Sequence, residues 1–282
     1  MGRTDLEGAI ALVSGGSSGI GRATAELLAR KGAHVVILAR DAGRLAQARE
    51  AVEAARRDDR QKVLAFTCDV SKWEDVEATV GEVQEVLGPV DVVMACAGYC
   101  LPMRFVEMPI EQFEAHLATD LLGVTYLARA VAPSMIERGR GHIAMVSSMG
   151  GFIGVYGYSA YSPAKFGVMG LAEVLRCELK PYGVGVTVLC PPNVDTPGYA
   201  REVRIEPPET AKINGSVTAA SPKDMARVFV SAVEKGKYLV IPGFTNKVLY
   251  RLKGLWPELF FAVFDHDVRA VHKQQGSGRS GS

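Results

Sequence analysis

The chain has 282 residues, 48% of them hydrophobic and 22% charged, and its 32 basic and 31 acidic residues leave a formal net charge of +1. This composition is typical of a globular protein with a sizeable core, and the even charge balance argues against a nucleic-acid partner. The five cysteines form no CxxC pair and no zinc-site spacing, which indicates reduced thiols in a cytoplasmic protein. We expect no signal peptide and no membrane-spanning segment.

Seven short apolar runs predict the strands of a sheet. They lie at residues 9–14, 33–38, 62–67, 90–95, 142–147, 184–189 and 238–241. Each is rich in Val and Ile and continuously apolar, which is typical of strands buried on both faces. Helix-like stretches such as "GRATAELLARKG" separate them. We therefore expect one α/β domain over residues 1–243, a doubly wound parallel sheet of about seven strands with helices on both faces.

A glycine-rich turn follows the first predicted strand, in "VSGGSSGIGRATAELLARKG". Gly15, Gly19 and Gly21 would allow a tight turn and bring the backbone close to a pyrophosphate at the amino end of the next helix. The hydroxyl donors at this turn are Ser14, Ser17 and Ser18. A strand before the motif and a helix after it favour a dinucleotide-binding (Rossmann) fingerprint over a turn that binds nothing.

The end of the second predicted strand indicates which dinucleotide is bound. An acidic residue there would bind a ribose 2′-hydroxyl, whereas an arginine suits a 2′-phosphate. Arg40 ends "VVILAR", and Arg44 follows one helical turn later. Because a guanidinium matches phosphate geometry, the sequence favours NADP(H). The alternative is that both arginines are solvated surface residues.

A tyrosine and a lysine flank the start of a later helix, in "YSPAK" at 161–165. Pro163 is tolerated in a first helical turn, and residues four apart share a face, so Tyr161 and Lys165 are neighbours. A nearby ammonium lowers the pKa of a tyrosine and makes it a general acid or base. Ser148 follows the fifth predicted strand, where its hydroxyl would bond a reacting carbonyl oxygen.

Together these pieces resemble the classical short-chain dehydrogenases/reductases over about residues 5–242. The matching segments are "SGGSSGIG", "CDV" at 68–70, "CAG" at 96–98, Ser148, "YSPAK" and "PPNVDTPG" at 191–198. The resemblance implies that Tyr161 is the proton donor and that Ser148 polarises the carbonyl. It also implies that Lys165 lowers the pKa of the tyrosine and holds the nicotinamide ribose.

The resemblance implies further cofactor contacts. Asp69 and Val70 would flank the adenine, and Val194 and Thr196 would contact the nicotinamide carboxamide. The full set expected to bind NADP(H) is Gly15, Ser17, Ser18, Gly19, Ile20, Gly21, Arg40, Arg44, Asp69, Val70, Ala97, Gly98, Tyr161, Lys165, Pro191, Val194 and Thr196.

Two positions depart from the family pattern. Asp120, in the helix before the fifth strand, stands where members usually carry an asparagine as the fourth catalytic residue. That asparagine is thought to hold a water through its main-chain carbonyl, so an aspartate would keep the function. A carboxylate near Lys165 would also shift the pH optimum. Ala95 replaces a second common asparagine.

Within the family, "ELKPYGVGVTVLCPPNVDTPGYARE" resembles the 3-ketodihydrosphingosine reductases, which reduce the C3 ketone of 3-oxosphinganine with NADPH. The likeness depends on Cys96, the corner at 180–182 and the double proline at 191–192. It implies a long-chain keto-amine lipid as the substrate, and a homodimer or homotetramer formed through the helices after strands four and five. The alternatives are another ketone or alcohol, such as a 3-oxoacyl thioester or a steroid, or a cofactor-binding sensor without turnover.

The pattern changes after residue 243. Residues 244–273 begin with basic and bulky apolar side chains, and the polar residues 274–282 are expected to form a flexible tail. An interfacial segment would place Lys247, Arg251 and Lys253 on headgroups of the cytoplasmic membrane face and the aromatic residues at the acyl boundary. The alternative is a helix that covers the substrate pocket or a subunit interface.

Overall fold

A computed structural model describes residues 4–215 and 218–279 and contains one parallel sheet of seven strands. The strands are β1 (Ile10–Ser14), β2 (His34–Ala39), β3 (Val63–Thr67), β4 (Val92–Ala95), β5 (Gly141–Val146), β6 (Val184–Leu189) and β7 (Leu239–Val240). Their order in the sheet is β3-β2-β1-β4-β5-β6-β7. Each of the seven apolar runs is therefore a strand, and the predicted parallel sheet is confirmed.

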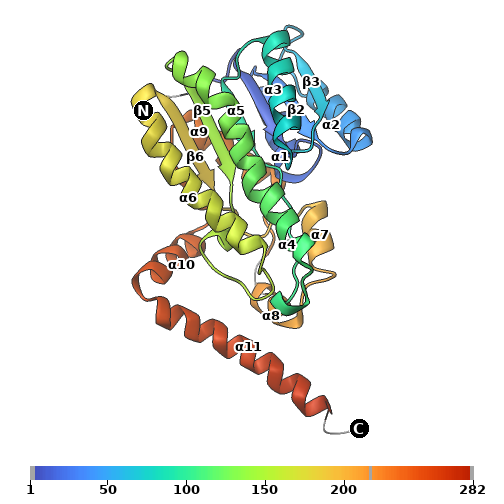
Figure 1. Cartoon of the computed structure of the whole chain (residues 1–282), viewed down its shortest axis with the longest axis vertical. Coiled ribbons are helices and arrows are strands. Elements are labelled where there is room, and N and C mark those ends of the chain that lie inside the picture. Colours follow the sequence, from blue (N-terminus) through green and yellow to red (C-terminus); the bar gives the residue numbers. More distant parts are fainter. Residues whose placement is uncertain (1–3, 216–217, 280–282) are drawn as a thin grey trace.

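Helices cover both faces of this sheet (Figure 1). The described helices are α1 (Gly19–Arg30), α2 (Ala42–Ala54), α3 (Trp73–Leu87), α4 (Ile110–Leu117), α5 (Gly123–Glu137), α6 (Tyr161–Leu179), α7 (Pro197–Glu202), α8 (Pro208–Asn214), α9 (Pro222–Glu234), α10 (Phe244–Leu255) and α11 (Pro257–Arg279). Short turns are η1 (Phe105–Glu107), η2 (Ala118–Leu122), η3 (Met149–Gly151) and η4 (Lys180–Tyr182). Helices α3, α5 and α6 pack on one face, and α1, α2 and α9 pack on the other.

The continuous apolar character of the strands has a direct cause in this two-faced packing. In β1, Leu12 packs into the core under α3, α5 and α6, whereas Ala11 and Val13 pack into the core under α1, α2 and α9. Successive side chains of a strand point to opposite faces. A strand covered on both sides is therefore largely apolar along its whole length.

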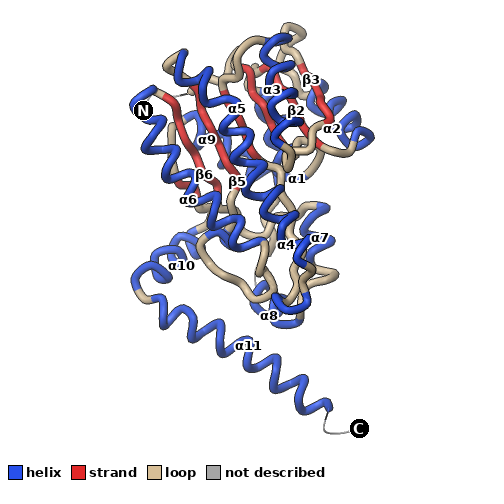
Figure 2. Tube along the Cα trace, in the orientation of Figure 1, coloured by secondary structure: helices blue, strands red, loops and turns tan. Residues whose placement is uncertain are grey.

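The sheet reverses its winding at β1, which pairs with β2 on one side and with β4 on the other. In doubly wound sheets, ligands bind at the carboxyl ends of the strands beside such a reversal. Figure 2 shows the strands gathered at one end of the molecule, with α7, α8, α10 and α11 at the other. The carboxyl ends of the strands face these helices.

Helix α10 begins directly after Gly243, whose φ of +86° favours a glycine. The ring of Tyr250 in α10 packs edge-on against Phe152, with 5.0 Å between ring centroids. Phe260 and Phe264 of α11 pack against the core, and their own rings lie 4.9 Å apart. Among the described helices, none combines the length and the apolar character needed to cross a bilayer.

The end of α11 differs from the expectation of a flexible tail. The helix continues to Arg279, so residues 274–279 are helical, while residues 280–282 lie outside the described residues. Adding a residue to an existing helix forms a hydrogen bond without the cost of a new nucleus. The polar composition of the tail was therefore a poor guide to its backbone.

Candidate active site

The residues singled out in the sequence come together at the carboxyl ends of the parallel strands. The glycine turn follows β1, Arg40 follows β2, Asp69 and Val70 follow β3, Ala97 and Gly98 follow β4, Ser148 follows β5, and Pro191, Val194 and Thr196 follow β6. Because all seven strands run in one direction, these segments share one edge of the sheet. Tyr161 and Lys165 reach the same edge from the first turns of α6.

Lys165 forms a buried ion pair with Asp120. The Nζ atom lies 3.0 Å from Asp120 Oδ1, and 4% of the lysine side chain and none of the aspartate side chain are exposed. Lys165 Nζ also donates to the carbonyl oxygen of Val146 at 3.2 Å. The backbone N–H of Tyr99 donates to Asp120 Oδ1 at 3.1 Å. Burial raises the pKa of Asp120, and the neighbouring Lys165 opposes that rise.

A π-helical turn and a glycine allow this ion pair to form. Asp120 lies in η2, a single π-helical turn between α4 and α5, and such turns are frequent at functional sites because they redirect a side chain. A Cβ on Gly98 would collide with Asp120 Oδ1 and lie 3.0 Å from Lys165 Nζ. Position 98 must therefore be a glycine if the two charged groups are to meet.

Tyr161 stands beside both Ser148 and Lys165. Lys165 Nζ lies 5.6 Å from the centroid of the Tyr161 ring. Ser148 caps η3, where its Oγ accepts from the Gly150 N–H at 3.0 Å, which leaves the hydroxyl hydrogen free to be donated elsewhere. A Cβ on Gly150 would lie 3.2 Å from the Tyr161 ring and 3.5 Å from Ser148 Oγ, so serine and tyrosine flank one small space.

The acidity of Tyr161 differs from the sequence expectation. Burial raises its pKa well above the usual range, and the Ser148 hydroxyl opposes this only in part. The sequence predicts that Lys165 lowers this pKa, but the lysine charge is also paired with Asp120. In the protein alone, burial therefore keeps the phenol protonated.

The turn after β1 is shaped for an anion. Gly15 and Gly19 have φ values of +65° and +53°, a region that side chains rarely adopt. Ser18 precedes α1 in an extended conformation and its side chain makes no capping bond. The first backbone N–H groups of α1 are therefore available to a phosphate, and no acidic residue stands in the first turn to repel one.

Ser14 does not have the expected role of a phosphate donor. It is fully buried, and its Oγ accepts hydrogen bonds from the backbone N–H groups of Cys96 at 3.1 Å and Ala97 at 3.2 Å. The serine thus joins the ends of β1 and β4 across the point where the sheet reverses. Its place as the last residue of the strand, inside the sheet, explains the difference.

The arginines after β2 differ from each other. Arg40 is exposed, and no carboxylate of the described residues lies within ion-pair distance of it. Arg44 lies 3.6 Å from Asp41, in a pair that is largely solvent-exposed. An exposed pair of this kind contributes about 0–1 kcal/mol. Both guanidinium groups therefore remain able to bind a phosphate at this strand end.

A second polar cluster lies next to Tyr161, and the sequence analysis missed it. The Tyr158 hydroxyl donates to a carboxylate oxygen of Glu202 in a short hydrogen bond, and Asn214 Nδ2 donates to the same hydroxyl at 3.1 Å. The Tyr158 ring packs edge-on against the Tyr161 ring at 5.4 Å. Tyr158 lies three residues before Tyr161, but Glu202 and Asn214 come from α7 and α8, so no local spacing connects them.

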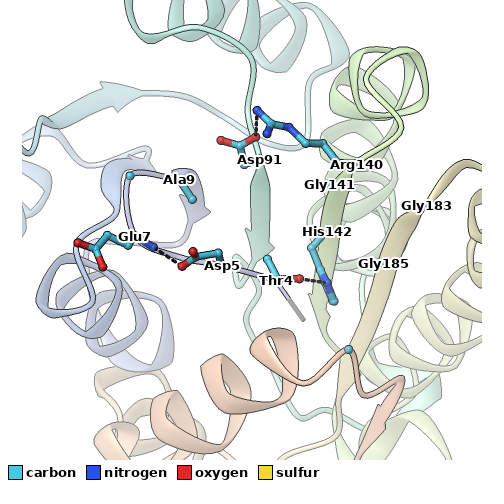
Figure 3. A pocket seen from close by; sticks show the side chains of 12 residues that line it. Thr4, Asp5, Glu7, Ala9, Asp91, Arg140, Gly141, His142, Gly183 and Gly185 are labelled. Atoms are coloured by element: carbon cyan, nitrogen blue, oxygen red, sulfur yellow. Dashed lines mark hydrogen bonds and ion pairs between the residues drawn. The ribbon is translucent and has the colours of Figure 1, made fainter. Parts of the chain in front are cut away.

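A different cavity lies at the amino ends of the strands, away from these residues (Figure 3). Its volume is about 510 Å³, and Asp91, Arg140 and His142 line it. His142 Nε2 lies 2.8 Å from Thr187 Oγ1, which itself donates to a backbone carbonyl, so the imidazole is the donor. His142 Nδ1 then accepts from the Thr4 hydroxyl at 3.1 Å. Burial lowers the pKa of His142 to about 4, which indicates a neutral structural residue.

Known proteins resemble this chain in sequence and in fold. The model of the short chain dehydrogenase family matches residues 9–205. The 3-dehydrosphinganine reductase of Danio rerio is 42% identical over 234 residues, 83% of this chain and 70% of that protein. The 3-ketodihydrosphingosine reductase of Dictyostelium discoideum is 36% identical over 278 residues, 92% of this chain and 82% of that protein.

Among solved structures, a short chain dehydrogenase/reductase from Burkholderia phymatum in complex with NAD has a TM-score of 0.79. The match covers 91% of this chain and 96% of that chain, at 24% identity. At this identity the likeness shows the fold alone.

Proposed function

Because the chain belongs to the short-chain dehydrogenase family of oxidoreductases, we propose that it reduces the C3 ketone of 3-oxosphinganine to the alcohol of dihydrosphingosine, with NADPH as the reductant. The observation that carries the chemistry is the placement of Ser148, Tyr161 and Lys165 at one point of the sheet edge. The names of two relatives, both sphingoid-ketone reductases, support the substrate.

The protein's own residues supply the acid chemistry of this reaction. The free hydrogen of Ser148 Oγ would be donated to the ketone oxygen and orient it beside Tyr161. Burial keeps Tyr161 protonated, so the phenol donates its proton to that oxygen as negative charge develops there. Lys165 then stabilises the phenolate that remains. Asp120 and the Val146 carbonyl hold the lysine in position during this step.

The residues at the glycine turn fit a dinucleotide. When bound, NADPH supplies the hydride. The turn at residues 15–21 offers backbone N–H groups and positive φ values without an acidic neighbour, and a Cβ at Gly19 would lie 2.9 Å from Thr196 Cγ2, so the loop after β6 closes on this turn. Arg40 is available for the 2′-phosphate. The wider set of cofactor contacts expected from the sequence is part of this proposal.

A long acyl chain needs apolar surface, and the loops around the site provide some. Phe105 and Val106 in η1 are 72% and 89% exposed, and Val203 and Ile205, which follow α7, are 47% and 44% exposed. Arg104, next to η1, donates to Glu209 of α8 at 3.1 Å, so η1 lies close to α8. These apolar side chains therefore border the same group of loops and suit a lipid better than a small polyol.

The carboxyl-terminal helices support a contact with the membrane surface. One side of the pair packs on the body through Tyr250, Phe260 and Phe264. The bulky residues left exposed are Phe244 (83%), Leu255 (67%), Trp256 (58%), Phe261 (48%) and Val263 (59%). Lys247 and Arg251 are exposed on the same helix as Phe244 and Leu255. Apolar and basic residues together are typical of a segment that lies on an anionic bilayer.

In this proposal the exposed side of the segment lies on the membrane surface, while the other side packs on the body. Sedimentation with anionic vesicles tests the contact. The double variant Trp256→Ser, Phe261→Ser should bind such vesicles more weakly than a Val86→Ser control, whose side chain is 60% exposed on α3. Equal sedimentation of both variants would contradict the membrane contact.

The proposal includes a homodimer or homotetramer formed through the outer faces of α5 and α6. Phe166 and Val174 of α6 are 39% and 53% exposed, which suits burial in such an interface. Light scattering of the purified protein measures the oligomeric state. A monomer at micromolar concentration would contradict this part of the proposal.

The reaction is tested by following NADPH oxidation with 3-ketodihydrosphingosine presented in liposomes, beside NADH and a short β-keto thioester. Turnover with the sphingoid ketone and NADPH supports the proposal. Turnover with the thioester alone would show that the substrate is a thioester and not the sphingoid ketone. Tyr161→Phe should abolish turnover and leave NADPH binding, measured by fluorescence, nearly intact. Tyr182→Phe, at an exposed tyrosine of η4, is the matched control. Full activity of the Tyr161 variant would contradict the mechanism.

A further inference from the structure

A carboxylate without a cationic partner lies beside the reaction site. Glu202, the last residue of α7, accepts from the Tyr158 hydroxyl, and no Lys, Arg or His nitrogen of the described residues lies within ion-pair distance of it. Glu209 of α8 offers a contrast, since its buried carboxylate pairs with Arg104 at 3.1 Å and with His272 at 3.0 Å. Glu202 is half-buried and lacks such a partner, and a charge that is partly removed from water is costly without one.

The surroundings of Glu202 favour its protonated form. Burial is the largest cause that raises its pKa, to about 7, and the charge of Glu206 adds to the rise, whereas the Tyr158 hydrogen bond opposes it. The titratable groups around this carboxylate are Cys100, Tyr158, Tyr161, Tyr199 and Glu206. None of them is cationic. A positive group that entered this space could therefore form an ion pair with the Glu202 carboxylate, which no cation of the described residues neutralises.

The position of Glu202 relative to Tyr161 limits which positive group can enter. Tyr158 contacts Glu202 through its hydroxyl and Tyr161 through its ring. The negative charge of Glu202 also contributes to the raised pKa of Tyr161, which requires the two groups to be close. A cation at Glu202 is thus near the ketone oxygen that Tyr161 protonates.

We propose that Glu202 binds the protonated amine that neighbours the reacting ketone of the substrate, and that it selects α-amino ketones over neutral ketones. This inference rests on the proposed function, in which the substrate carries an amine on the carbon next to the carbonyl. That amine is only two bonds from the reacting carbon, so it must lie close to Tyr161 whenever the ketone does. Glu202 is the carboxylate that shares Tyr158 with Tyr161, and it has no cationic partner among the described residues.

Two further side chains orient the carboxylate. Asn214 Nδ2 donates to the Tyr158 oxygen at 3.1 Å, so the Tyr158 hydrogen is directed at Glu202. Asn214 also donates to Glu206 at 3.1 Å, which holds the amide between the two acids. Tyr158 thereby occupies one oxygen of Glu202. The Cys100 thiol also hydrogen-bonds this carboxylate, but a thiol is a weak donor, so an ammonium would compete with that thiol alone. Tyr158 and Asn214 are positioning residues in this arrangement.

The test compares two ketones that differ only in the amine. The probes are 3-ketodihydrosphingosine and the analogue with hydrogen in place of the amino group, each assayed with NADPH. We expect the unaltered enzyme to favour the amine by about 30-fold or more in kcat/KM, the size typical of losing one partner of a buried charge pair. Glu202→Gln should bring this ratio close to one, and the loss should be in KM.

Control variants separate recognition from folding. Glu85→Gln removes the same charge at an exposed position of α3, away from the reaction site, and should keep the preference for the amine. Tyr158→Phe keeps the ring against Tyr161 but releases the carboxylate, and should lower the ratio in part; it tests the idea even if the Glu202 variant does not fold. An unchanged ratio in folded Glu202→Gln, or an equal loss on both ketones, would overturn the inference.

The outcomes also distinguish this inference from the function on which it rests. If the enzyme reduces the amino ketone but Glu202→Gln leaves the kcat/KM preference for the amine unchanged, the inference fails and the proposed function stands. If the unaltered enzyme reduces neither ketone, the proposed function fails and the inference fails with it.

Discussion

The ammonium of Lys165 lies 3.0 Å from the carboxylate of Asp120, and both side chains are buried. The family usually carries an asparagine at this position, so this chain places a charged carboxylate where a neutral amide is common. The lysine charge therefore acts on Tyr161 and on Asp120 at once. This sharing reduces the effect of the lysine on the phenol and makes the acidity of Tyr161 depend on residue 120.

Changing Asp120 to Asn should alter the pH dependence of the reaction. The amide oxygen can still accept from Lys165, but the negative charge is lost, so the pKa of Tyr161 should fall. The alkaline limb of ketone reduction, where the tyrosine loses its proton, should move to lower pH by about one unit. A pH profile of kcat/KM measures the shift. An unmoved limb in the folded variant would show that the Asp120 charge does not reach Tyr161.

Gly98→Ala should disrupt the same ion pair from the opposite side. The added methyl group would collide with Asp120 Oδ1, so we expect kcat to fall by about 100-fold, as for other small displacements of catalytic groups. Gly170→Ala is the control, because its Cβ on α6 would meet nothing within 4 Å. It should add about 0.5–1 kcal/mol of stability. Equal kcat values for the two variants would contradict this account of Gly98.

Arg40→Asp should change the cofactor preference. The substitution removes the guanidinium proposed for the 2′-phosphate and supplies an acid for a ribose 2′-hydroxyl. We expect the KM for NADPH to rise by about 10-fold or more and the KM for NADH to fall. Arg49→Asp, on the outer side of α2, reverses a charge of the same kind at a pair with Glu53. If both variants lose NADPH affinity equally, the effect comes from overall charge.

Amine recognition should depend on pH through Glu202, whose pKa burial raises to about 7. Below that pH the carboxyl is protonated and cannot pair with an ammonium, so the KM for the amino ketone should rise as the pH falls through 7. The KM for the analogue without the amine should change little over this range. Parallel curves for the two substrates would contradict the prediction.

His142 should make the fold sensitive to acid. Its pKa is lowered to about 4 in the folded protein and is about 6.5 when unfolded. Between these values the unfolded chain binds a proton that the folded chain does not, so stability rises with pH across this window and is lost as the pH falls. The loss is at most about 3 kcal/mol.

Urea unfolding at pH 5 and pH 7 measures that loss. His142→Gln has no proton to gain, so the difference between the two pH values should be smaller in this variant than in the unaltered protein. The variant keeps a donor for Thr187. A difference of the same size would assign the acid sensitivity to other groups.

The sheet could be predicted because its signal is local. Each strand is largely apolar and lacks a polar–apolar alternation, as is typical of a strand covered on both faces, and β1 and β6 are buried throughout. The neighbouring positions of Tyr161 and Lys165 could be predicted for the same reason, since they lie four positions apart in one helix. The short segment "YSPAK" is therefore enough to predict that the tyrosine and the lysine share one face of a helix.

The remaining contacts depend on packing over long distances in the chain. The Asp120 carboxylate is 45 positions from Lys165 and reaches it through a π-helical turn that no residue pattern announces. Glu202 meets Tyr158 across 44 positions. Ser14 carries a hydroxyl that could bind a phosphate, but the residue lies inside the sheet, where its Oγ instead accepts from the backbone N–H of Cys96 after β4. The spacing of residues along the sequence therefore predicts none of these contacts.

The buried Glu209 carboxylate lies between two elements that are remote in the chain, the loop of Arg104 and helix α11 of His272. Helix α8 carries both Glu209 and Asn214, so it links the last helix of the chain to the cluster beside Tyr161. Where the proposed membrane contact fixes α11, the position of this helix and the order of that cluster would be coupled, and such coupling is reciprocal. A bilayer that holds α11 in place would raise the affinity of the cluster for a lipid headgroup. A bound lipid would in turn strengthen the attachment of α11 to the bilayer.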